Sequence, residues 1–260
     1  MALRLEGLSK RFHAGSADER VALDQVSLDL PEGGFMIVIG SNGSGKSTLL
    51  NAVSGQVALD AGVVRIDGRD VGGTAEHERA AQVSRVLQDP LRGTLATMTI
   101  EENLALADMR TRGRGLAPAL GSARRERFAA ALAVFGLGLE ARLGARAGVL
   151  SGGQRQVLAL AMAVLNPPRV LLLDEHTAAL DPRTAQLVME ATLRAVAAAR
   201  ITTLMVTHNM QSAIAYGDRL VMMDAGRVRL DVGGAEKRAM TVEALVRRFH
   251  LADDKMLLST

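Results

Sequence analysis

Short apolar segments recur along the chain, and most of them end in a polar or glycine-rich group. The run at 35–39 is fully apolar and partly β-branched, which predicts a buried strand of a parallel sheet. Runs at 170–173 and 201–206 have the same character and predict two further buried strands. Period-two alternation within 21–30 predicts a strand with one buried face. Because such strands alternate with helical patterns, we expect an α/β fold.

Helical patterns dominate the middle of the sequence, from about residue 91 to 165. Thr99 and Glu102 have the spacing of a capping box, which predicts a helix that begins there and runs through 104–109. Ser151 is the expected N-cap of a later helix that ends before Pro167 and Pro168. The other predicted elements are strands at 2–12, 63–66, 83–87, 220–223 and 226–230, helices at 122–135, 184–199 and 241–250, and a flexible Gly- and Arg-rich loop at 111–121.

One stretch organises the rest, because it matches the phosphate-binding P-loop pattern G-x-x-x-x-G-K-[ST] between a predicted strand and a predicted helix at 49–54. Glycines let backbone N–H groups close around phosphate oxygens, and the helix N-terminus adds positive potential. Lys46 can reach the β- and γ-phosphates, and the Ser47 hydroxyl can ligate Mg²⁺. The expected nucleotide contacts are Gly40, Ser41, Asn42, Gly43, Ser44, Gly45, Lys46, Ser47 and Thr48. The competing interpretation is a Gly/Ser-rich turn.

Bulk composition narrows the class of protein without defining it. The 260 residues are 48% hydrophobic and include no cysteine, which suits a reducing cytoplasm. No signal-peptide pattern opens the sequence, and its longest stretch without Asp, Glu, Lys or Arg, 201–217, is too polar to span a membrane. We expect a soluble protein that reaches a membrane only through a partner.

Basic residues exceed acidic ones only slightly, 31 against 28, and cluster at 110–114 and 124–127. A solvated helical face is the favoured interpretation, and contact with anionic lipid or RNA is the alternative. Nucleic-acid modules commonly interleave aromatic residues for base stacking. Neither cluster contains one of the five Phe or the single Tyr, so no nucleic-acid partner is expected.

A second anion site is suggested at Ser151, Gly152, Gly153 and Gln154, which offer a hydroxyl and bare backbone amides at a predicted helix N-terminus. By itself this pattern fits an ordinary serine N-cap equally well. The P-loop upstream and the acidic end of the strand at 170–173 favour the anion site.

The P-loop, the Leu150-Ser-Gly-Gly-Gln154 segment and the apolar strand ending in Asp174-Glu175 together resemble the ATPase subunit of ABC transporters, in the right order over about residues 3–230. The resemblance implies a P-loop NTPase core with a β-rich flank and a helical insertion subdomain. It places the core at about 1–90 and 166–230, the helical subdomain at about 91–165 and a helical tail at 231–260, within one domain, 1–260.

By the same resemblance, Asp174 is the carboxylate that holds Mg²⁺ through water, and Glu175 is the catalytic base. Gln88 resembles the glutamine that contacts Mg²⁺ and the attacking water, and His208 resembles the histidine that contacts the γ-phosphate. Phe12 takes the place of the aromatic that stacks on adenine. Without the resemblance, these last three residues would fit a loop glutamine, a core histidine and a core phenylalanine.

ATP and Mg²⁺ are therefore the implied cofactors, with Ser47, Gln88 and Asp174 as the implied metal ligands. The implied assembly is a homodimer in which Ser151, Gly152, Gly153 and Gln154 of one chain complete the site of the other. Implied partners are membrane permease subunits and a substrate-binding protein, at the cytoplasmic face of the inner membrane.

His176 departs from the family, which usually has proline there. The segments 174–182 and 206–210 resemble a tryptophan/tyrosine-type amino-acid uptake subgroup, so ATP hydrolysis that drives amino-acid uptake is the expected function. The alternatives are a soluble ABC-type ATPase of translation or DNA repair, a P-loop kinase, and the energiser of an export system. A kinase would leave Ser151 and Glu175 unexplained.

Overall fold

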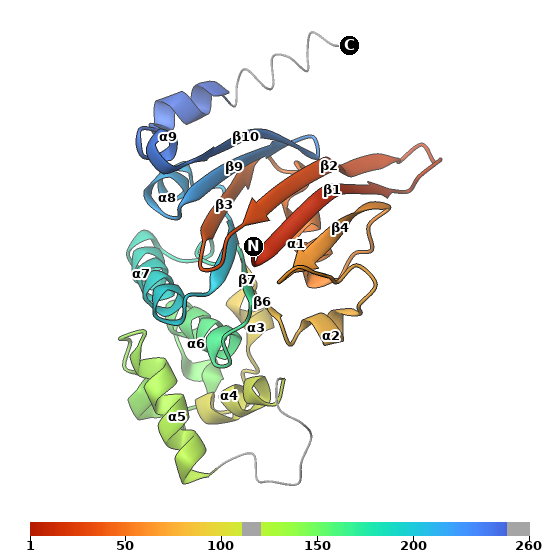
Figure 1. The fold of residues 1–260 in the computed structure, drawn as a ribbon. Helices are drawn as coiled ribbons and strands as arrows, with labels where there is room; N and C mark the ends of the chain where they lie inside the picture. Colours follow the sequence, from red (N-terminus) through yellow and green to blue (C-terminus); the bar gives the residue numbers. More distant parts are fainter. Residues whose placement is uncertain (111–120, 249–260) are drawn as a thin grey trace. The chain divides into compact units, whose positions relative to one another are not determined.

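The computed structural model describes residues 1–110 and 121–248, and the chain forms two compact units (Figure 1). The first unit comprises Met1–Arg79 and Thr202–Thr260, and the second comprises Ala80–Ile201. Each unit has its own strands and helices. In the described ranges, no helix is both long and apolar enough to cross a bilayer.

An antiparallel sheet in the first unit follows the predicted strands near the N-terminus. Its order is β2-β1-β4-β5, and its members are β1 (Leu3–Phe12), β2 (Arg20–Leu30), β4 (Ala61–Ile66) and β5 (Arg69–Asp70). Leu3 pairs with Leu30 on β2 and with Ile66 on β4, and all three side chains are buried. The expected strands are confirmed. The two-residue β5 was not predicted, because so short a strand has no readable period.

The second sheet of this unit contains the apolar strand that precedes the P-loop. Here β3 (Phe35–Gly40) lies between β8 (Thr202–Val206) and β9 (Arg219–Asp224) and is parallel to both. Every residue of β8 is buried, as are Phe35 to Ile39, which explains the unbroken apolar sequence of both strands. The expected hairpin is confirmed, because β10 (Arg227–Gly233) pairs antiparallel with β9.

The helices of the first unit include one predicted helix and several that are too short to predict. Helix α1 (Lys46–Ser54) begins three residues before the expected Leu49 and ends, as expected, at Gly55. The helices that were not predicted are α2 (Glu76–Arg79), α8 (Met210–Ala215) and α9 (Gly234–Arg238). Residues 242–248 are helical, and the rest of the predicted C-terminal helix lies outside the described residues.

Helices make up most of the second unit, as the sequence predicts for its middle part. They are α3 (Pro90–Gly93), α4 (Ile100–Asp108), α5 (Ser122–Ala133), α6 (Gly152–Val164) and α7 (Pro182–Ala199), with 3-10 turns at Leu139–Arg142 and Ala147–Val149. Helix α6 contacts the other four helices and is the central one. The predicted flexible loop lies outside the described residues, apart from Gly121.

Two strands complete the second unit, and both are at the predicted positions. They are β6 (Val83–Val86) and β7 (Val170–Asp174), which pair in parallel with Val86 opposite Leu173. Val170 to Leu173 are fully buried. The division of the chain into a core, a helical subdomain and a tail stays a prediction.

Candidate functional site

The P-loop connects the carboxyl end of β3 to the first turn of α1, as its sequence predicts. Gly45, the residue before the helix, has φ 104°, which lies in the left-handed region. A Cβ atom there would lie 2.3 Å from the carbonyl oxygen of Ala22. Both the backbone conformation and the lack of space therefore require glycine at this position.

Lys46 is buried within the loop that it closes. Its Nζ donates hydrogen bonds of 2.8 Å to the carbonyl oxygens of Gly40 and Ser41. The Ser47 side chain is exposed, one residue further along the helix. A lysine amine and a serine hydroxyl are thus presented in the first turn of a helix, where the helix dipole favours anions.

One other predicted residue of the first unit, Phe12, lies at the end of a strand pair that approaches this loop. Phe12 pairs with Arg20 across β1 and β2, and Arg20 Nη2 donates a 3.0 Å hydrogen bond to the Gly43 carbonyl oxygen. The Phe12 ring is partly exposed, with Lys10 Nζ 5.6 Å from its centroid. Phe12 is therefore not a fully buried core side chain.

His208 follows β8 at the same edge of the sheet as the P-loop. The parallel register sets Val206 opposite Val38, so both strands end toward the same side. The His208 side chain is exposed, which differs from a core histidine. Asn209 then caps α8 by accepting a 2.8 Å hydrogen bond from the Ser212 N–H.

In the second unit, the paired strands β6 and β7 bring three further predicted residues to one edge. Gln88 follows β6, and Asp174 and Glu175 stand at the end of β7. Glu175 has φ 46°, a left-handed conformation that is uncommon for a side chain of this size. Sparsely populated backbone conformations concentrate at functional sites, where the surrounding structure maintains them.

The Ser151 segment begins α6 with a complete capping box. Ser151 Oγ accepts a 3.3 Å hydrogen bond from the Gln154 N–H, and the Gln154 side chain accepts one of 3.2 Å from the Ser151 N–H. At Gly153 a Cβ atom would lie 2.2 Å from Thr184 Cγ2 on α7. The N-cap is thus confirmed, and the packing of α7 accounts for the second glycine.

Several residues around these positions were missed by the sequence analysis. Gln156, fully buried on α6, donates a 3.1 Å hydrogen bond to the carbonyl oxygen of Leu87, next to Gln88. Arg85 on β6 pairs with Asp174 at 2.5 Å. The signal for Arg85 was a charged residue inside a short buried strand. Gln156 carries no local signal, because its partner is 69 residues away.

His176 is a buried side chain beside the acidic pair. Its Nε2 lies 3.1 Å from Thr192 Oγ1, and that hydroxyl donates to the carbonyl oxygen of Val188 at 2.8 Å. The hydroxyl therefore accepts from an Nε2–H tautomer. Burial lowers the pKa of His176 from 6.5 to about 4, so the ring is neutral at pH 7.

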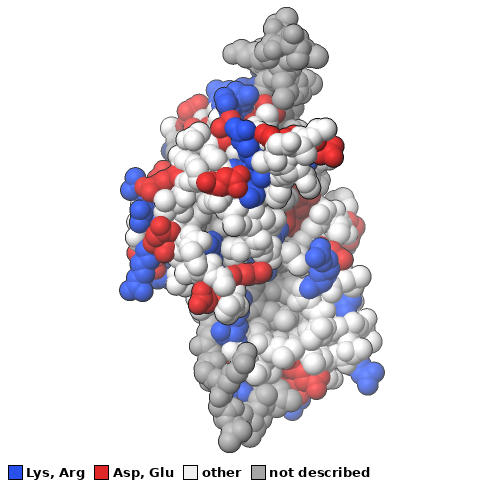
Figure 2. All heavy atoms as spheres, turned by 90° about the vertical axis from the view of Figure 1, so that its right-hand side faces the viewer, with Lys and Arg blue, Asp and Glu red and all other residues white. Residues whose placement is uncertain are grey.

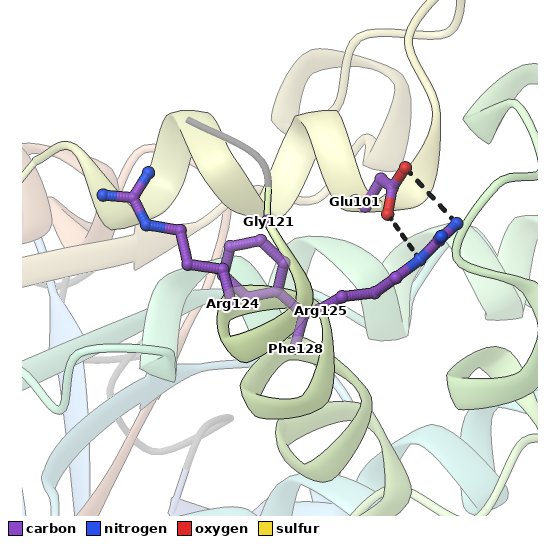
Figure 3. Close-up of a pocket in the computed structure, with 5 residues that line it drawn as sticks. All are labelled: Glu101, Gly121, Arg124, Arg125 and Phe128. Carbon is purple, nitrogen blue, oxygen red and sulfur yellow. Dashed lines mark hydrogen bonds and ion pairs between the residues drawn. The ribbon is translucent and has the colours of Figure 1, made fainter. Parts of the chain in front are cut away.

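A hollow in the second unit lies among helices and is lined by none of the predicted nucleotide or metal residues. It measures about 270 Å³ and is lined by Glu101, Gly121, Arg124, Arg125 and Phe128 (Figure 3). The Arg125 guanidinium points to Glu101 at 2.9 Å, and Arg127 pairs with Asp108 at 2.6 Å. Arg125 fits the solvated-face interpretation of the basic cluster at 124–127, whereas Arg127 pairs with the buried Asp108. Charges of both signs are interspersed on the face seen in Figure 2.

The oxygen donors of this chain suit a small divalent cation. Ser47 supplies a hydroxyl, Asp174 a carboxylate and Gln88 an amide oxygen, and Mg²⁺ prefers such hard oxygen ligands. No cluster of three or more His, Cys, Asp or Glu occurs among the described residues. Mg²⁺ commonly takes one or two protein ligands and completes its shell with substrate phosphates and water, so the donors of each unit are chemically suitable for it.

A phosphate-binding loop between a parallel strand and a helix, together with a second parallel strand that ends in two acids, defines the class of P-loop nucleoside triphosphatases. Solved structures agree with this class. An ATP-binding cassette in a dimeric, post-hydrolysis state with ADP and Pi is 28% identical at a TM-score of 0.75, covering 89% of this chain and 98% of that one. Another cassette, in its ADP conformation, has a TM-score of 0.78 at 27% identity and covers 94% and 98%.

Relatives found by sequence are more similar to this chain than those solved structures are. The tyrosine transport ATP-binding protein of Clostridioides difficile (strain R20291) is 43% identical over 250 residues, which cover 96% of this chain and 99% of that protein. A sulfate/thiosulfate import ATP-binding protein of Chromobacterium violaceum is 36% identical over 87% of this chain and 57% of that protein. Residues 23–178 match the family described as ABC transporter. The chain therefore belongs to the ABC transporter family.

Membership confirms the expected α/β fold with a P-loop NTPase core, and it makes the chain an ATP-binding, ATP-hydrolysing protein. The kinase alternative is excluded. The roles of the individual residues stay predictions.

Proposed function

We propose that this ATPase drives the uptake of an amino acid of the tyrosine type through a separate membrane permease. The observation that carries the proposal is the 43% identity to a tyrosine transport ATP-binding protein over nearly the full length of both chains. Other relatives are named as import proteins for sulfate, aliphatic sulfonates, methionine and phosphonates. Uptake is therefore common to these relatives, whereas the substrate varies among them.

The phosphates of ATP are bound by the P-loop in this proposal. Backbone N–H groups of Gly43 to Thr48 donate to the phosphate oxygens, and Lys46 exchanges its bonds to loop carbonyls for the β- and γ-phosphates. Ser47, Asp174 and Gln88 would hold Mg²⁺, which would neutralise charge on the phosphates. Phe12 offers its partly exposed ring to adenine.

Hydrolysis requires a base and a means to position water. The carboxylate of Glu175 accepts the proton of the attacking water, and the left-handed backbone at this residue sets the direction of its side chain. Gln88 orients the same water. His208 donates to the γ-phosphate from the end of β8.

The proposed working unit is a homodimer that sandwiches two ATP molecules. Each nucleotide is bound by the P-loop of one chain and by Ser151, Gly152, Gly153 and Gln154 of the other. The dimer works at the cytoplasmic face of the membrane, peripherally, with permease subunits and a substrate-binding protein as partners. The dimeric state of a solved cassette with ADP and Pi supports this arrangement.

Uptake of labelled tyrosine by cells that lack this gene tests the proposal. Wild-type protein should restore uptake, and the Lys46→Ala variant, which loses the phosphate-binding amine, should not. An Arg125→Met variant is the control, since it removes a positive charge at a residue that is not among the predicted nucleotide contacts. It should restore uptake as the wild type does. Restoration by Lys46→Ala, or uptake that does not depend on the gene, would contradict the proposal. Greater retention of tyrosine without the gene would indicate export.

A further inference from the structure

Arg85 forms an ion pair with Asp174, the carboxylate that we assign to Mg²⁺. Arg85 Nη2 lies 2.5 Å from Asp174 Oδ2, and the two side chains are only 15% and 18% exposed. Arg85 lies opposite Leu172 in the parallel register of β6 and β7, so its guanidinium reaches along β7 to the residue at the strand end. The contact is thus fixed by two paired strands within one unit.

The pairing of the strands themselves does not need this ion pair. Backbone pairing continues from Val83 opposite Val170 to Val86 opposite Leu173, and the flanking side chains of β6 are apolar or small. A largely buried ion pair stabilises a fold little, and an apolar residue of similar volume often does as well or better. A charged residue at this position therefore calls for an explanation other than stability.

The electrostatic consequence concerns any cation that approaches Asp174. A guanidinium at hydrogen-bonding distance offsets most of the carboxylate's negative potential, and partly buried charges interact strongly because water screens them poorly. A divalent ion, or the water that it polarises, must share this carboxylate with Arg85 or displace the guanidinium.

We propose that Arg85 is a positioning residue that holds the Asp174 carboxylate before the metal arrives and raises the Mg²⁺ concentration needed for tight ATP binding. The inference rests on the proposed function, in which Asp174 serves Mg²⁺. In this proposal Arg85 acts through Asp174, with which it pairs, and has no role of its own toward nucleotide or water. Arg85 therefore changes how much Mg²⁺ is needed for ATP to bind. ATP binding in the absence of metal should be the same with and without Arg85.

The test uses the full chain with Glu175→Gln as a background, so that bound ATP is not hydrolysed. ATP binding is titrated with Mg²⁺, and metal occupancy is measured separately with Mn²⁺ by electron paramagnetic resonance. In the Arg85→Met variant, which keeps an apolar stem without the charge, the half-saturating Mg²⁺ concentration should fall about tenfold. Arg85→Lys should restore most of the parent value. Arg85→Gln is a second neutral variant, in case the first does not fold.

Arg125→Met is the matched control, because it removes one positive charge from an ion pair elsewhere in the same unit. It should leave the Mg²⁺ requirement unchanged. An unchanged or higher requirement in both neutral Arg85 variants overturns the inference, since a purely structural arginine would disorder Asp174 and weaken metal binding. If the parent shows no Mg²⁺-dependent ATP binding, the proposed function fails and the inference falls with it.

Discussion

Single residues show how closely chemistry and packing are combined beside the acidic strand end. His176 replaces the proline that is usual after the Asp-Glu pair, and the structure buries it against Thr192. A buried imidazole resists protonation, because the charged form loses its hydration. His176 therefore contributes a neutral, hydrogen-bonded side chain to the core of the second unit.

Stability should fall on acidification because of His176. The pKa of the folded state, about 4, lies below the unfolded value of 6.5, so the unfolded chain binds more protons between these pH values. The contribution is complete above pH 6.5 and is lost toward pH 4, by on the order of 3 kcal/mol. Denaturation of the metal-free protein at several pH values measures this loss.

A His176→Leu variant serves as the reference for this measurement, since leucine fills the site without titrating. The difference in pH dependence between wild type and variant should appear only between pH 6.5 and 4. Equal slopes in the two proteins, or an NMR titration of His176 near 6.5, would show that the ring is not buried in its neutral form.

Elements differ in how far the sequence predicts them. The capping box at Thr99 and the N-cap at Ser151 were predicted, because the partners of each lie three residues apart on the chain. Helix α2 was not, because it depends on Arg79, which donates to the Ala52 carbonyl oxygen at the end of α1, 27 residues away. Local patterns define helix ends, whereas contacts between distant segments define the short elements and pairs such as Arg85 with Asp174.

The close contact of α6 with α7 predicts that Gly153 cannot carry a side chain. Alanine usually stabilises a helix relative to glycine by about 1 kcal/mol. Here its Cβ atom would meet Thr184 Cγ2, so Gly153→Ala should instead destabilise the protein by about 1–3 kcal/mol. Adding Thr184→Ser, which removes that methyl group, should recover most of the loss. Urea denaturation of the wild type, the two single variants and the double variant gives the coupling energy. A Gly153→Ala protein more stable than the wild type would contradict the contact.

At the scale of the whole molecule, the sequence predicted the family and the strand ends that carry its chemistry. The P-loop, Gln88, the acidic pair and His208 all follow parallel strands, as expected. Whether the chain shares nucleotides with a second copy is beyond what local patterns can determine, because such contacts would lie between molecules. That arrangement needs a test of its own.

A mixed dimer of one Lys46→Ala chain and one Ser151→Arg chain provides that test, with Glu175→Gln in both chains to stop turnover. If each site uses the P-loop of one chain and Ser151 of the other, both lesions fall on one site. The mixed dimer should then trap about one ATP, and either parent dimer little. No trapped ATP in the mixed dimer, while Glu175→Gln alone traps it, would contradict shared sites.

The central claim is that the P-loop binds ATP and Glu175 supplies the base for its hydrolysis. The most direct measurement compares bound ATP with turnover in wild type, Glu175→Gln and Lys46→Ala. Glu175→Gln keeps the shape of the side chain but loses the proton acceptor, so it should bind Mg·ATP and lose nearly all turnover, about 100-fold or more. Lys46→Ala should lose both binding and turnover. Near wild-type hydrolysis by Glu175→Gln, or normal ATP binding by Lys46→Ala, would contradict this account.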